Sequence, residues 1–152
     1  MVWAATASDS IMPLDLSLTA DPTPADLAVL SGSLTAFNAA DAGPSDRIPL
    51  AIFVRDDAGT ILAGLNGYTG WGWLYVQWLW VDASLRGQGF AGRMLDMAET
   101  EARKRGCHGA YIDTFNPVAL KTYQRQGYAP FGTLPDFPPG RTRTFLQKSL
   151  GD

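Results

Sequence analysis

The chain has 152 residues, of which 46% are apolar, a formal net charge of −3 and one cysteine, Cys107. This length can bury one substantial core, so we expect a single domain over residues 1–152. The scattered lysines and arginines argue against a nucleic acid partner, a single cysteine excludes an internal disulfide, and no apolar run is long enough to span a membrane, so we expect a cytoplasmic protein.

The first part of the chain predicts a strand followed by a helix. Residues 1–12 are small and polar and are expected to be flexible. Residues 14–19 alternate apolar and polar side chains, which predicts a strand. Thr23 at the cap and Pro24 at the first helical position predict that a helix begins there. Its apolar residues recur at helical spacing, and we expect them to face the core: Leu27, Leu30, Leu34 and Phe37.

Three consecutive antiparallel strands are predicted next. Residues 49–55 and 61–68 are apolar, β-rich runs separated by Asp56-Asp57-Ala58-Gly59, a hairpin signal. Gly70-Trp71-Gly72 then turns the chain into a third strand, residues 73–81. This strand and the turn before it are dense in tryptophan and tyrosine. Two explanations stay open, packing on both faces of a central strand or an aromatic-walled pocket that binds an amine by cation–π contacts.

A glycine-rich turn after the third strand carries a chemical signal. Gly87, Gly89 and Gly92 leave backbone amides accessible, and the helix predicted over residues 91–105 directs its unpaired N–H groups and positive dipole end at the same point. Such an arrangement binds anions, phosphate above all. The glycines also fit the dinucleotide pattern G-x-G-x-x-G, with Asp113 as the ribose-binding acid of an oxidoreductase. Only 39 residues follow Asp113, too few for a doubly wound sheet.

The helix over residues 91–105 has an apolar stripe, which we expect to be buried: Met94, Leu95, Ala98 and Ala102. Its charged residues, Glu99 among them, are predicted to face water. Gly106 is expected to end the helix. Residues 110–115 follow as a strand, which should lie parallel to the third strand through a right-handed crossover.

A third helix and two further strands complete the prediction. Asn116 can cap the helix, Pro117 fits its first position and Gly127 stops it. Helical spacing then places Ala119, Leu120 and Tyr123 on the inward side. Residues 128–133 and 141–150 read as strands joined by a rigid, proline-rich link.

Two of these motifs resemble a known family. Arg86-x-x-Gly89-x-Ala91 resembles the pyrophosphate loop of the GNAT superfamily of acyl-CoA N-acyltransferases, and residues 116–128 resemble its motif N-x-x-A-x-x-x-Y-x-x-x-G-F/Y. The link over residues 134–140 is similar to one in a bacterial GNAT subgroup. The resemblance implies an α/β (α+β) GNAT fold: a mixed, mostly antiparallel sheet with a central parallel strand pair, flanked by helices.

The resemblance also implies an activity and its partners. The chain would transfer an acetyl group from acetyl-CoA to a primary amine of a small molecule or peptide, by direct attack in a ternary complex. A non-catalytic acyl-CoA-binding or sensor domain is the alternative. A homodimer is compatible with either reading. The sequence has no cluster of cysteine and histidine, so we expect no metal.

Specific residues receive roles from the resemblance. Tyr123 would protonate the leaving thiolate, because the reference pKa of a tyrosine, about 10, lies above the value of about 8.5 for a thiol. Asn116 would orient the pantetheine or a water, and a backbone N–H at a bulge, from Leu79 or Trp80, would stabilise the oxyanion. The residues expected to contact CoA are Leu79, Trp80, Val81, Arg86, Gly87, Gln88, Gly89, Phe90, Ala91, Gly92, Asn116 and Tyr123.

The acceptor side is less well marked in the sequence. Phe37 and Asn38 lie in a segment that contributes to the acceptor pocket in the family, and the third strand offers Tyr75 and Gln77. Asp113 would orient the substrate or take the proton of the amine, and a water chain is the alternative base. We therefore expect substrate contacts from Phe37, Tyr75, Gln77 and Asp113.

Overall fold

The computed structural model describes residues 13–151. The flexible segment predicted for residues 1–12 lies outside the described residues. The chain divides into two compact units, Met1–Gly43 and Pro44–Asp152, and each is described by itself. The single domain over residues 1–152 stays a prediction.

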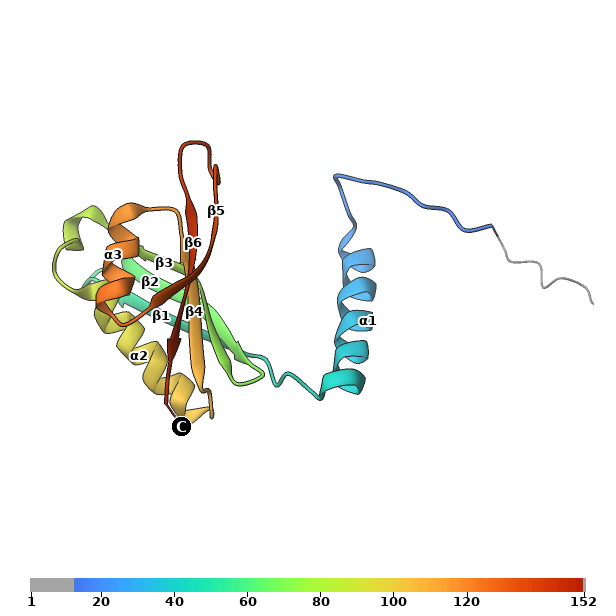
Figure 1. Cartoon of the computed structure of the whole chain (residues 1–152), viewed down its shortest axis with the longest axis horizontal. Coiled ribbons are helices and arrows are strands. Elements are labelled where there is room, and N and C mark those ends of the chain that lie inside the picture. The colour runs from blue at the N-terminus through green and yellow to red at the C-terminus, as the bar shows by residue number, and fades with distance from the viewer. Residues whose placement is uncertain (1–12, 152) are drawn as a thin grey trace, which may run out of the picture. The chain divides into compact units, whose positions relative to one another are not determined.

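The first unit contains one helix, α1 (Pro24–Ala42), drawn in blue in Figure 1. Its start is as predicted: the Thr23 side chain accepts a hydrogen bond from the Asp26 N–H at 3.1 Å, and Pro24 holds the first helical position. No residue of α1 is buried within its own unit, and the prediction that its apolar stripe faces the core stays a prediction. One helix without a second layer in its unit cannot bury a face.

The strand predicted over residues 14–19 is also wrong. These residues form no regular secondary structure, and none of the six described strands pairs with them. Alternation of apolar and polar residues sorts side chains onto two faces, but a strand also needs a hydrogen-bonded neighbour. The side chains of Leu14, Leu16 and Leu18 are accordingly exposed.

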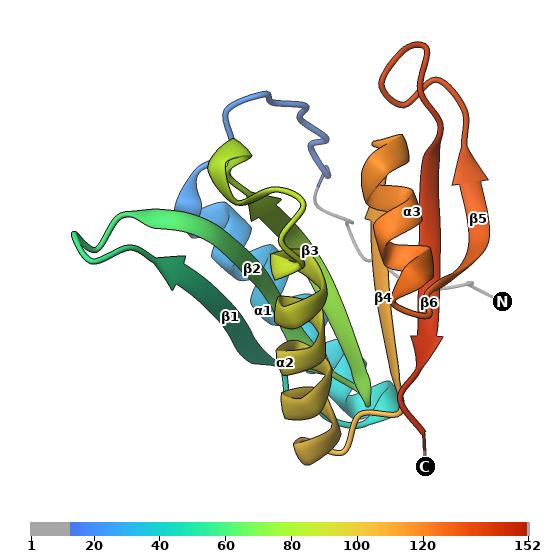
Figure 2. The same cartoon turned by 90° about the vertical axis from the view of Figure 1, so that its left-hand side faces the viewer.

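The second unit is built on one six-stranded sheet, shown in Figure 2. Its strands are β1 (Ile48–Arg55), β2 (Ile61–Gly70), β3 (Trp73–Val81), β4 (Gly109–Thr114), β5 (Ala129–Leu134) and β6 (Arg143–Ser149), in the order β1-β2-β3-β4-β6-β5. Among the described strands only β3 and β4 run parallel. This is the mixed, mostly antiparallel sheet with a central parallel pair that was predicted.

The parallel strands β3 and β4 are paired over only part of their length. Their register runs from Trp73 opposite Gly109 to Val76 opposite Ile112, and no pairing follows. Figure 2 shows the two strands diverging beyond that point, with α2 (Phe90–Lys104) and α3 (Pro117–Arg125) beside the gap. Beyond that pair, the backbone N–H and C=O groups of β3 and β4 that face each other form no hydrogen bonds between the two strands.

Both helices pack on one face of the sheet. The apolar stripe of α2 is buried as predicted, and it forms one core with Tyr123 of α3 and the inward residues of the sheet. Those sheet residues include Leu65, Leu74, Val76, Ile112 and Leu146. Ala119 and Leu120 pack against this core, which confirms the inward side predicted for α3.

A bulge in β3 changes which side chains face the helices. Asn66 pairs with Trp78 but Gly67 pairs with Val76, so Gln77 is an extra residue. After the bulge, Trp78 and Trp80 turn to the face away from α2 and α3, where they are 66% and 51% exposed. Packing on both faces of the central strand, one of the two explanations above, therefore does not hold for these two tryptophans within this unit.

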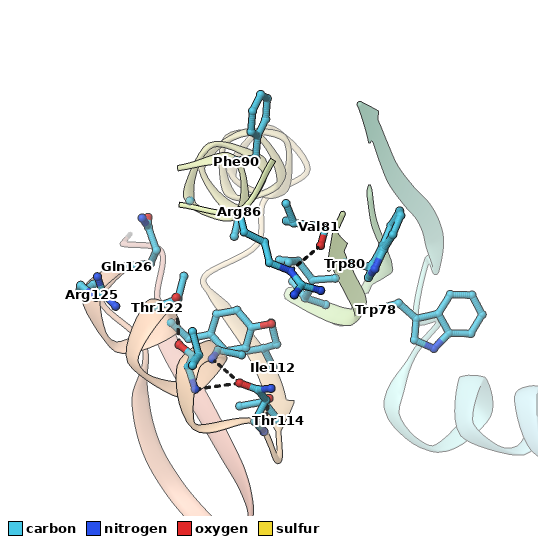
Figure 3. A pocket seen from close by; sticks show the side chains of 18 of the residues that line it. Trp78, Trp80, Val81, Arg86, Phe90, Ile112, Thr114, Thr122, Arg125 and Gln126 are labelled. Atoms are coloured by element: carbon cyan, nitrogen blue, oxygen red, sulfur yellow. Dashed lines mark hydrogen bonds between the residues drawn. The ribbon is translucent and has the colours of Figure 1, made fainter. Parts of the chain in front are cut away.

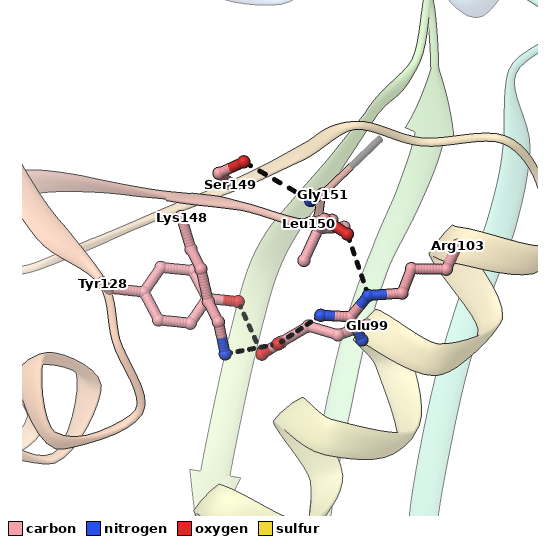
Figure 4. A network of polar contacts seen from close by, with 7 residues as sticks. All are labelled: Glu99, Arg103, Tyr128, Lys148, Ser149, Leu150 and Gly151. Carbon is pink, nitrogen blue, oxygen red and sulfur yellow. Dashed lines mark hydrogen bonds and ion pairs between the residues drawn. The ribbon is translucent and has the colours of Figure 1, made fainter.

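The position predicted for Glu99 of α2 is also wrong. It was predicted to face water but is only 1% exposed. Figure 4 shows it held by the Nζ of Lys148 at 2.6 Å, the hydroxyl of Tyr128 at 3.1 Å and, more distantly, Arg103 at 3.9 Å. Position 99 lies one turn from Leu95 and so belongs to the apolar stripe. Its charge is buried because β6 and the residue before β5 bring partners to it.

Candidate active site

The first turn of α2 is open to a ligand. Its cap is Gly89, with φ of +79°, and among the residues that the structure describes no side chain hydrogen-bonds to this turn. Gly87 also has a positive φ, +77°, and a Cβ added at either glycine would meet no atom within 4 Å. The two glycines are thus needed for the backbone conformation. They leave the unpaired N–H groups of the helix start accessible.

Gly92 has a different reason to be glycine. It is buried, and a Cβ at this position would collide with the side chain of Gln126, which follows α3. The missing side chain therefore lets α3 approach the first turn of α2. Gly92 brings together the two helices that border the site.

A cleft of about 1010 Å³ opens where β3 and β4 separate (Figure 3). It is bordered by the ends of both strands, the glycine turn, the start of α2 and one side of α3. Of the residues predicted to contact CoA, the following line it: Leu79, Trp80, Val81, Arg86, Gly87, Gly89, Phe90, Ala91, Gly92, Asn116 and Tyr123. Gln88 does not, and its side chain donates to the carbonyl oxygen of Ser84 at 3.2 Å.

Several lining residues were not predicted from the sequence. They include Trp78, Thr114, Phe115, Val118, Thr122, Arg125, Gln126 and Arg143. Helical spacing could have found Val118, Thr122 and Gln126, which follow one another at intervals of four along one side of α3. No local signal marks Arg143, because β6 brings it to the cleft from the end of the chain.

Tyr123 places a protonated phenol at the cleft. The residue is 5% exposed, and nothing among the described residues hydrogen-bonds to its hydroxyl. Burial raises the pKa of Tyr123 to about 12, and the negative charge of Asp113 contributes in the same direction. At neutral pH the hydroxyl therefore keeps its proton and remains free to donate it.

Two polar residues at the cleft are partly committed to the fold. The Oδ1 of Asn116 accepts from the backbone N–H groups of Val118 and Ala119 at 2.8 and 3.1 Å, the predicted cap of α3. Only its amide nitrogen is left for a ligand. Arg86 donates from Nε to the carbonyl oxygen of Val81 at 3.3 Å, which holds its guanidinium beside the end of β3 (Figure 3).

The backbone of β3 presents alternate residues to the gap. The N–H of Asp82 donates to Leu62 of β2 at 2.8 Å, whereas the carbonyl of Val81 points away and accepts from Arg86. By the alternation of an antiparallel pair, the N–H of Leu79 also points away from β2, and that of Trp80 points toward it. The bulge expected near Leu79 or Trp80 lies at Gln77 instead.

The predicted acceptor residues are only partly brought together. Gln77 and Asp113 line the cleft. Tyr75 does not, but its hydroxyl lies 3.4 Å from Oδ2 of Asp113, and burial together with that carboxylate raises the pKa of Tyr75. Phe37 belongs to the first unit, so its contact with substrate stays a prediction.

Two negative findings apply to the described part of the chain. Over residues 13–151 no three side chains of histidine, cysteine, aspartate or glutamate come together as metal ligands would. No described helix combines the length and the apolar character that crossing a bilayer requires.

Comparison with known proteins gives a consistent result. The Acetyltransferase (GNAT) family matches residues 25–128. Acetyltransferase Atu2258 of Agrobacterium fabrum is 51% identical over 115 residues, 76% of this chain and 84% of that protein. The Blasticidin-S acetyltransferase of Streptomyces morookaense is 41% identical over 101 residues, 66% of this chain and 74% of that protein.

Solved structures of acetyltransferases share the fold of this chain. The crystal structure of a candidate acetyltransferase from Agrobacterium tumefaciens superposes with a TM-score of 0.83 at 46% identity, covering 91% of this chain and 99% of that one. An acetyltransferase from Bacillus cereus, 24% identical, shares the fold with a TM-score of 0.76 over 88% of this chain and 97% of that one.

Proposed function

The chain belongs to the GNAT family of acetyltransferases, and from this premise we propose that it transfers an acetyl group from acetyl-CoA to a primary amine of a small molecule or peptide. The amine attacks directly, in a ternary complex. One observation carries this: the uncapped start of α2 and the side chain of Tyr123 border the same cleft. A small acceptor is supported by the 41% identical relative, which is named for blasticidin-S.

The start of α2 is suited to hold the pyrophosphate of CoA. Unpaired N–H groups of Gly89, Ala91 and Gly92 and the positive end of the helix dipole favour an anion at this point. Gln88 contributes its backbone N–H, since its side chain points elsewhere. Arg86 adds a positive charge at the edge of the same cleft.

Acetyl-CoA would supply a thioester carbonyl and a thiol leaving group. Leu79 is a better donor to the carbonyl oxygen than Trp80, because its N–H points toward the gap between β3 and β4. Tyr123, with a pKa of about 12, would pass its proton downhill to a thiolate whose conjugate acid has a pKa of about 8.5. The amide nitrogen of Asn116 is left to orient the pantetheine or a water.

The amine would approach beside Gln77 and Asp113. Trp78 and Trp80 are exposed and line the cleft, which supports the aromatic-walled pocket over simple packing. Asp113 or a water chain would take the proton of the amine, and both routes stay open. A cytoplasmic location and a homodimer also stay predictions.

A charge placed at the start of α2 tests the CoA site. In Ala91→Glu, a carboxylate at the cleft would repel the diphosphate, and we expect the Kd for CoA, measured by calorimetry, to rise about tenfold or more, ~1.4 kcal/mol. Met97→Glu is the matched control, because Met97 is exposed on the same helix and does not line the cleft. Equal Kd values for the two variants would contradict the proposed site.

Activity and ligand preference separate the alternatives. Acetyl-CoA with a panel of amines should release free CoA, measured by a thiol reagent. Stabilisation by CoA without release for any amine would favour the sensor domain. Thermal stabilisation by NAD but not by CoA would favour the oxidoreductase.

A further inference from the structure

Arg143 is a charged residue of the cleft that the proposed reaction leaves without a role. It lies at the start of β6, and its Nη1 donates to Oδ1 of Asp113 at 2.9 Å. Its guanidinium lies 4.0 Å from the ring centre of Phe137 and 5.1 Å from that of Phe115. One carboxylate oxygen and two aromatic rings therefore hold the group in a defined position beside the cleft.

Most of the hydrogen-bonding capacity of Arg143 is unused. A guanidinium has five N–H donors, carried by Nε, Nη1 and Nη2. The Nε of Arg143 is buried without a partner, and its Nη2 makes no hydrogen bond to the described residues. Arg105 is different: its Nε and Nη1 bond to Glu101, to two backbone carbonyls and to Thr69.

The ion pair lies where the amine must enter. Asp113 is the first residue of β4 beyond the last pair with β3, Val76 opposite Ile112, and it lines the cleft together with Gln77. Its charge contributes to the raised pKa of Tyr123, which lines the same cleft. The second oxygen of Asp113 has only a long contact, 3.4 Å, with the hydroxyl of Tyr75. That oxygen can still accept a hydrogen bond from a substrate.

We infer that Asp113 and Arg143 together recognise the acceptor, and that the acceptor carries its amine one carbon away from a carbonyl or carboxylate oxygen. Oδ2 of Asp113 accepts from the amine, and Nη2 of Arg143 donates to the oxygen. Free amino acids and the N-terminal residues of peptides share this chemistry. A plain amine would leave Nη2 of Arg143 without a partner. The inference rests on the proposed function, because it names the substrate class of the same site.

Matched acceptors test the inference with the full chain and saturating acetyl-CoA. Each set contains an amino acid, its amide and the amine left after removal of the carboxylate, and the rate of CoA release gives kcat and KM. We expect the amino acid or its amide to exceed the plain amine in kcat/KM by about tenfold or more. A preference for the acid indicates free amino acids, and one for the amide indicates peptide N-termini.

Two substitutions separate recognition from a structural role. Arg143→Gln should abolish the preference by raising KM for the oxygen-bearing acceptor by a larger factor than KM for the plain amine. Arg143→Lys keeps a positive charge beside Asp113 but lacks the planar fork, so it should not restore the preference. Arg141→Gln, an exposed arginine two residues away, is the control and should behave like the unaltered chain.

Three results would overturn the inference. Equal kcat/KM for the plain amine and its oxygen-bearing counterparts would remove it while leaving the proposed function intact. Full restoration by Arg143→Lys would reduce Arg143 to a neutralising charge. No CoA release with any acceptor would overturn the proposed function and this inference with it. Thermal stabilisation of both Arg143 variants by CoA verifies that they are folded.

Discussion

Two carboxylates of the same unit have similar partners but differ in exposure and in whether they line the cleft. Glu99 of α2 pairs with Lys148 and accepts from Tyr128, and Asp113 of β4 pairs with Arg143 and lies near Tyr75. The side chain of Glu99 is 2% exposed and away from the cleft, whereas that of Asp113 is 14% exposed and lines it. Lys148 and Tyr128 direct their polar groups at Glu99, whereas Nη2 of Arg143 makes no hydrogen bond to the described residues. Residue type alone therefore does not separate a structural carboxylate from a site carboxylate.

Two tyrosines repeat the contrast. Tyr128 donates to Glu99, and burial and that carboxylate raise its pKa. Tyr123, five residues earlier, has no such partner among the described residues, and it borders the cleft. Burial and a nearby carboxylate raise the pKa of both phenols, but of the two only Tyr123 borders the cleft, where the proposed reaction needs a proton donor.

The largest effect is expected from removing the hydroxyl of Tyr123. Tyr123→Phe should lower kcat about 1000-fold, ~4 kcal/mol in the barrier, because the leaving thiolate loses its acid. The Kd for CoA, measured by calorimetry, should change less than about twofold. The matched change Tyr128→Phe should leave kcat within about twofold and cost about 1 kcal/mol of stability, since Glu99 loses a hydrogen bond. A kcat for Tyr123→Phe within about threefold of the unaltered chain would exclude Tyr123 as the acid.

The next largest effect concerns stability. Glu99→Ala removes the carboxylate that Lys148, Tyr128 and Arg103 contact, and it leaves the partly buried Lys148 without its partner. We expect the free energy of unfolding, from urea titration, to fall by about 3 kcal/mol. Glu101→Ala, on the same helix, breaks a more exposed pair with Arg105 and should cost less than about 1 kcal/mol. Equal losses in the two variants would show that Glu99 is not a structural centre.

The smallest expected effect concerns the pH dependence of kcat, which Tyr123 should leave flat between pH 8 and 10. A tyrosine with a pKa of about 10 would have lost half of its protons at pH 10. Because burial raises the pKa of Tyr123 to about 12, its acid form persists there, and kcat should not fall between pH 8 and 10 through this residue. A descending limb below pH 10 that disappears in Tyr123→Phe would contradict the raised pKa.

The sequence by itself determined the features that depend on a few neighbouring residues. Thr23 and Asn116 cap helices, Gly59 takes a positive φ in its hairpin, and the spacing around Tyr123 turns it inward, all as expected. Capping bonds and backbone conformation involve residues within about four positions, so residue identity is sufficient to predict them. The order of strands and helices along the chain followed from the same local signals, apart from the strand predicted over residues 14–19.

Only the tertiary structure decided which distant residues meet. Arg143 and Asp113 are 30 residues apart and are joined by the pairing of β4 with β6. Glu99 is buried because Lys148 and Tyr128 reach it, and the bulge at Gln77 decides where Trp78 and Trp80 point. The alternating residues 14–19 found no partner strand. Strand register and the covering of each face depend on the whole fold, so no local pattern encodes them.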